Sequence, residues 1–160
     1  VGSRTTPYFY NYCFPNKKNI MEKTSSKLYG LHESSVSWIN ELEFMNDEQN
    51  FLEHLLSTHF LDLSAEKLYE TTRKLIRKLK EVENMGVELT QEIQIHNKKI
   101  AAVLEGDDKI REKDLINGHD MIQKDFESYV LKFRYVKKKI FGIIKEIMVN
   151  HKQKLLINRT

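Results

Sequence analysis

The chain has 160 residues, a length typical of one domain, and its residues are 40% hydrophobic and 31% charged. With two prolines and six glycines, this balance favours a helical protein and excludes a disordered one. No apolar run approaches the roughly 18 residues that cross a bilayer, so we expect no membrane span. The formal net charge of +3 equals the three cations Arg4, Lys17 and Lys18, which gives no reason to expect nucleic acid as a partner.

Residues 1–20 differ in composition from the rest of the chain. They contain both prolines, the single cysteine and no acidic residue. We interpret them as a disordered tail or an upstream extension, with an aromatic arm packed on the bundle as the alternative. Residues 21–34 are then either a linker or an extension of the first helix. The single cysteine, Cys13, allows no internal disulfide and favours a reducing compartment, so we expect a cytoplasmic protein.

Three later segments contain no proline and have apolar residues at alternating spacings of three and four. They predict helices at about 35–60, 64–105 and 108–153, within a helical bundle that covers residues 35–156. Seams of this length with heptad spacing predict coiled-coil-like packing. The seam of the second helix contains Leu68, Thr72, Leu75, Leu79, Val82, Gly86, Leu89, Ile93, His96, Ile100 and Val103.

Short loops between these helices make consecutive helices antiparallel neighbours. Folding the second and third helices about their loop places Gly86 opposite Tyr129, and His96 opposite His119. Folding the first helix about its own loop adds Trp38 to the layer of Gly86 and Tyr129, so that the smallest residue faces two of the largest. The expected fold is all-α: an antiparallel three-helix bundle whose long hairpin, formed by the second and third helices, protrudes beyond Trp38.

The charges are segregated along the chain. Residues 28–66 contain acids but no lysine or arginine, whereas residues 130–160 contain many bases and one acid, Glu146. Because the first helix is expected beside the C-terminal half of the third, these two patterns should compensate within the molecule. We therefore do not expect the basic run at residues 137–139 to bind nucleic acid.

Some apolar residues lie outside the heptad seams. Phe44 and Phe51 form a second stripe on the first helix, and Phe141, Ile144 and Met148 form one on the third. A three-helix bundle buries wide faces, so these residues can belong to the core. The alternative is an exposed surface that binds a second copy of the chain or a helix of a protein partner. Both interpretations stay open, and the second makes these five the candidate interaction residues.

The motifs of the common enzyme and cofactor classes are missing from the sequence. There is no glycine-rich phosphate loop, no Glu-x-x-His pair of a di-metal bundle and no pair of histidines four residues apart. Cys13 has no histidine partner in a folded segment that would activate it. We therefore expect neither an enzyme nor a bound cofactor, and no small-molecule substrate is evident.

The facing pair His96 and His119 is the one candidate site with chemistry of its own. Two imidazoles can bind zinc or copper, and Glu92, one helical turn before His96, is the candidate third ligand. The pair can also act as a pH switch, because two imidazolium groups in a seam repel each other below about pH 6.5. The third interpretation is a polar layer that fixes the register of the hairpin.

Heptad spacing is too general to indicate a family. The function most consistent with the pattern is a non-enzymatic structural or protein-interaction module that associates with itself as a homodimer. The alternative is a small metal-binding or pH-responsive bundle that uses the layer of His96 and His119.

Overall fold

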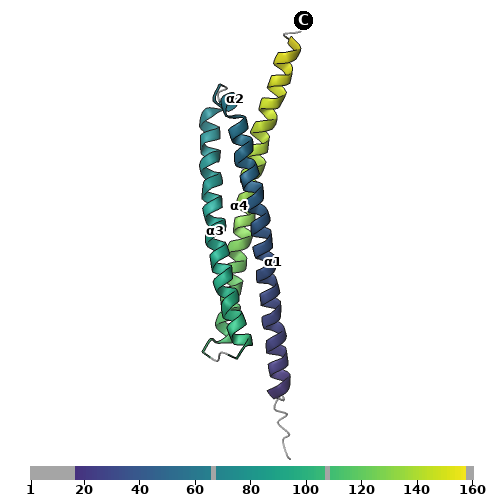
Figure 1. Ribbon diagram of the computed structural model, residues 1–160, viewed down its shortest axis with the longest axis vertical. Helices are drawn as coiled ribbons and strands as arrows, with labels where there is room; N and C mark the ends of the chain where they lie inside the picture. The colour runs from purple at the N-terminus through teal and green to yellow at the C-terminus, as the bar shows by residue number, and fades with distance from the viewer. Residues whose placement is uncertain (1–16, 66–67, 107–108, 158–160) are drawn as a thin grey trace, which may run out of the picture.

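The computed structural model describes residues 17–65, 68–106 and 109–157 of the chain. Within these ranges it contains helices and no strand, which confirms the all-α class. The helices, labelled in Figure 1, are α1 (Lys17–Thr58), α2 (Phe60–Ala65), α3 (Tyr69–Leu104) and α4 (Glu112–Ile157).

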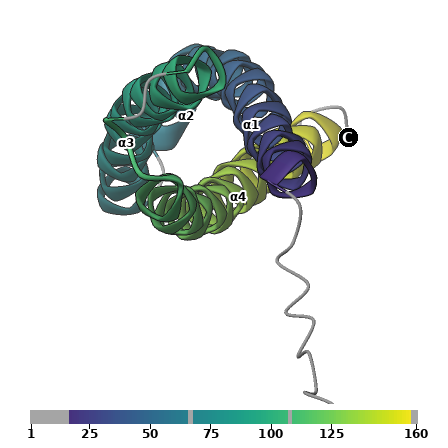
Figure 2. The ribbon, with the colours of Figure 1, turned by 90° about the horizontal axis from the view of Figure 1, so that it is seen from below.

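The three long helices pack along one another as a helical bundle. In Figure 1, α1 and α4 run in one direction and α3 runs in the other, with α2 turning the chain between α1 and α3. Figure 2, an end-on view, shows α1, α3 and α4 arranged around a common axis, and each of them contacts the other two. Among the described residues, no helix combines the length and the apolar character that crossing a membrane requires.

The first long helix is longer than the sequence pattern predicted. It begins at Lys17 rather than near residue 35, so residues 17–20, assigned to an extension, are helical. Residues 21–34 are helical as well, and of the two alternatives for them the helix extension is the one observed. The predictions for residues 1–16 lie outside the described part of the chain.

The added length of α1 covers the tip of the hairpin formed by α3 and α4. Leu28 is 2% exposed and packs with Ile100 and Leu115, which flank the hairpin loop. Three helices are therefore packed where a two-helix protrusion beyond Trp38 was expected. The reason is that Leu28 continues the apolar seam of α1 into this region, where burial of apolar surface stabilises the contact.

The register between α3 and α4 is the predicted one. An ideal Cβ built on Gly86 would lie 2.9 Å from the hydroxyl oxygen of Tyr129, so the tyrosine ring occupies the space that the glycine leaves. The loop that joins the two helices contains Gly106, whose φ of 101° is a conformation that glycine adopts without strain.

The register of α1 differs from the prediction. The residue of α1 that joins the layer of Gly86 and Tyr129 is Gln49, whose Nε2 donates a hydrogen bond of 3.1 Å to the Tyr129 hydroxyl. Trp38 lies elsewhere, stacked on His119 with ring centroids 4.5 Å apart. The error arises because the short helix α2 occupies a segment that the prediction treated as a tight turn, and this displaces α1 along the bundle.

We expect Gly86→Ala to destabilise the fold by about 1–3 kcal/mol, because the new methyl group overpacks a buried ring. Tyr129 cannot swing away freely, since it is 2% exposed, bonded to Gln49 and stacked on Phe133. The matched control is Gly142→Ala on α4, where an added Cβ meets nothing within 4 Å. Alanine there should stabilise the helix by up to about 1 kcal/mol. Urea unfolding followed by circular dichroism measures both, and equal stabilisation by the two substitutions would contradict the packing.

Candidate functional site: a buried histidine pair and an exposed apolar surface

His96 of α3 and His119 of α4 meet inside the bundle. Their side chains are 6% and 5% exposed, and Nδ1 of His119 lies 3.3 Å from Nε2 of His96. The ring centroids are 5.4 Å apart. At this distance one imidazole donates a hydrogen bond and the other accepts it, which requires at least one neutral ring. The predicted meeting of the two histidines is therefore confirmed.

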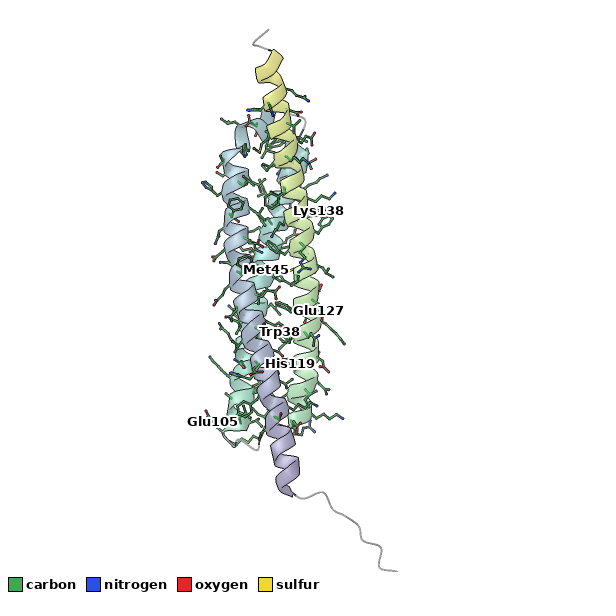
Figure 3. The ribbon with its side chains drawn as sticks, turned by 90° about the vertical axis from the view of Figure 1, so that its right-hand side faces the viewer. Trp38, Met45, Glu105, His119, Glu127 and Lys138 are labelled. Carbon is green, nitrogen blue, oxygen red and sulfur yellow. The ribbon has the colours of Figure 1, made fainter. Side chains whose placement is uncertain are left out.

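Helix α1 closes this layer with an aromatic ring. Trp38 stacks on His119, with an interplanar angle of 27°, and lies 5.7 Å from the ring of Phe126 between centroids. Figure 3 labels Trp38 and His119 at the same level of the bundle. Nearby, Nδ1 of His32 lies 2.5 Å from the side-chain oxygen of Asn97. The prediction missed these α1 partners because it placed Trp38 in the layer of Gly86, which lies ten residues before His96 on α3.

Both histidines are held in the neutral form near pH 7. Burial, together with smaller contributions from the charges of His119 and Lys99, lowers the pKa of His96 to about 4. Burial also lowers the pKa of His119, while the nearby Asp120 acts in the opposite direction. The pair can therefore take up protons only at a pH low enough to offset the free energy that the charged rings lose when they are buried away from water.

The third predicted metal ligand does not join the histidines. Glu92 is exposed and lines a groove between α3 and α4 together with Asp125 and Lys132. Within the described ranges, no group of three or more histidine, cysteine or acidic side chains is arranged to hold a metal ion. The structure thus brings together two of the three predicted ligands, His96 and His119.

The predicted interaction residues divide into exposed and buried members. Ile144 is 4% exposed and belongs to the main core cluster, so it is a core residue and not part of the exposed surface. A wide buried face of α4 explains this burial, as the sequence pattern allowed. The other four are between 42% and 63% exposed: Phe44, Phe51, Phe141 and Met148.

These four exposed side chains lie on one face of the bundle. An ion pair between Glu48 of α1 and Lys137 of α4 joins the two helices along their seam. Phe44 and Phe51 lie one turn before and one turn after Glu48, and Phe141 lies one turn after Lys137.

Met148 continues this face, since it lies two turns beyond Phe141. Figure 3 views the bundle from the side on which α1 and α4 run next to each other. We call the set Phe44, Phe51, Phe141 and Met148 the α1–α4 apolar surface.

Parts of the acidic and basic patterns meet within the molecule. Besides the pair of Glu48 and Lys137, Nε2 of His151 lies 2.8 Å from a carboxylate oxygen of Asp62. In the basic run, the ammonium of Lys139 lies 5.6 Å from the centroid of the Tyr135 ring. Part of the positive charge that the sequence concentrates on α4 is therefore engaged in contacts within the same chain.

Comparison with known proteins gave no relative. No family model matches the chain, and no curated protein and no solved structure matches it. Conclusions about function therefore rest on the chain's own residues and their geometry.

The histidine pair makes stability depend on pH. The pKa values of both histidines are lower in the folded protein than the usual value near 6.5 of an unfolded chain. The contribution of the neutral pair to stability is therefore fully present above about pH 6.5, and it is lost as the pH decreases toward 4. We expect the pair to reduce the free energy of unfolding by about 2 kcal/mol between pH 7 and pH 4.5.

Urea unfolding across this pH range measures the effect, and the double variant His96→Leu, His119→Leu is the control. Carboxylates titrate equally in both proteins, so the difference between their pH profiles isolates the pair. The variant should have the flatter profile. Parallel profiles would show that the histidines do not titrate differently in the folded and unfolded chains.

Proposed function

We propose that this chain is a non-enzymatic protein-interaction module that associates with itself through the α1–α4 apolar surface. The observation that carries the proposal is the gathering of four large, exposed apolar side chains along one seam between two helices. Contiguous apolar patches on soluble proteins usually mark an interface. The single cysteine, Cys13, supports a reducing compartment such as the cytoplasm for this module.

A second copy is a partner of suitable shape. Two helices of one copy can pack against the same two helices of the other, which gives the four-helix packing that apolar helix faces favour. Burying the exposed halves of these side chains in two copies contributes on the order of 8–12 kcal/mol. Because association itself costs roughly 4–15 kcal/mol, this gain allows at most a reversible dimer of modest affinity.

Light scattering across the micromolar range tests this proposal, once with chelator present and once with zinc. We expect a concentration-dependent dimer in both, because the surface needs no metal. The double variant Phe51→Gln, Phe141→Gln should weaken the dimer at least about tenfold, since it removes two anchors of the interface. The matched control is Leu131→Gln, a residue of α4 that is 67% exposed and lines the groove toward α3. A monomer at every concentration, or equal weakening by the control, would refute the proposal.

A second candidate function is acid sensing by the histidine layer, and the contact of 3.3 Å between two buried imidazoles favours it. Protonating both rings puts two like charges in contact, and Lys99 adds to the repulsion whereas Asp120 opposes it. Separation of α1 from the hairpin at Trp38 would let both rings hydrate. Acid would then loosen the N-terminal half of α1.

The chain has one tryptophan, so the fluorescence of Trp38 reports on this layer directly. We expect its emission to shift to longer wavelength between pH 7 and pH 4.5, before the helical signal is lost. His119→Leu should remove that early step. Emission that changes only with global unfolding would exclude the sensor. A shift caused by zinc at neutral pH, absent from His96→Leu, would favour the metal-binding alternative instead.

A further inference from the structure

We infer that the self-association is a parallel two-fold dimer in which α1 of each copy lies against α4 of the other. This inference rests on the proposed function and adds the orientation of the partner. It follows from the charges that border the α1–α4 apolar surface on its two sides.

The α1 side of this surface is acidic. Glu41 and Asp47 are exposed and lie within one turn of Phe44, and Glu48 lies one turn after it. In residues 28–58, which form most of α1, there is no lysine or arginine. A partner helix that packs on this side therefore meets negative charge.

The α4 side is basic. Lys138 and Lys145 are exposed and lie one turn before and one turn after Phe141, and Arg134 lies one further turn back. Lys138 is labelled on α4 in Figure 3. Its neighbour Lys137 already pairs with Glu48 within the same chain. A partner helix that packs on this side meets positive charge.

Symmetry connects these two sides to the orientation of a dimer. A two-fold axis parallel to the bundle places α1 of one copy opposite α4 of the other, so acids face bases on both sides. A two-fold axis across the bundle places α1 opposite α1 and α4 opposite α4, so like charges face each other. Apolar burial is similar in both arrangements, and the charges therefore select the parallel one.

Charge exchange tests which helices face each other. The variant Glu41→Lys, Asp47→Lys makes the α1 side basic, and we expect it to weaken the dimer about tenfold or more. Adding Arg134→Glu and Lys138→Glu to the same chain should restore affinity, because acids and bases again face each other. All four side chains are exposed, so the fold should tolerate the changes. In an antiparallel dimer, like charges would face each other both before and after the first change, so the affinity would stay the same. Unchanged affinity in the first variant would therefore overturn the inference.

Distance measurement decides the orientation independently. A spin label at Lys27→Cys, in the full chain with Cys13→Ser, lies about 35 Å along α1 from the middle of the surface, at 1.5 Å per residue. In a parallel dimer the two labels are roughly 20–35 Å apart, as expected for neighbouring helices, whereas in an antiparallel dimer they are about 70 Å apart. A dimer with the long distance overturns the inference and leaves the proposed function standing. A monomeric mass in light scattering removes both.

Discussion

The hydrogen bond from Gln49 to the hydroxyl of Tyr129, next to Gly86, fixes the alignment of the three long helices. Tyr129 is 2% exposed, and a buried tyrosine needs a partner for its hydroxyl group. Gln49 of α1 supplies the donor, and Gly86 of α3 supplies the space for the ring. A slip of any one helix by a heptad would leave a polar group unpaired or place a larger side chain against the ring. Burial raises the pKa of Tyr129, while the hydrogen bond from Gln49 acts in the opposite direction.

The rest of the molecule follows from this alignment. Glu48, the residue before Gln49, comes opposite Lys137 and joins α1 to α4 at the seam. About three turns toward the N-terminus, the same alignment sets Trp38 on His119. The apolar surface and the histidine layer are thus both positioned by one polar contact in the core. A polar group in an apolar seam serves here to specify register more than to add stability.

The sequence predicted the hairpin of α3 and α4 well and the placement of α1 poorly, for physical reasons. Two uninterrupted seams joined at Gly106 leave little freedom, so the meetings of Gly86 with Tyr129 and of His96 with His119 could be read from spacing alone. The join between α1 and α3 contains α2, and a short apolar segment does not reveal whether it is a turn or a helix. Exposure was equally difficult to predict, because Ile144 and Phe141 have similar spacing on α4 but only the first is buried.

A double-mutant cycle between Gln49 and Tyr129 tests the alignment most directly. The four proteins are the wild type, Gln49→Leu, Tyr129→Phe and the double variant, and urea unfolding gives the free energy of each. Each single change should destabilise by about 1–2 kcal/mol, because it leaves the other group buried without its partner. The double variant should recover much of that loss, with a coupling energy of about 1 kcal/mol or more. Additive effects would mean that the two groups do not meet, and the alignment of α1 with α4 would then be wrong.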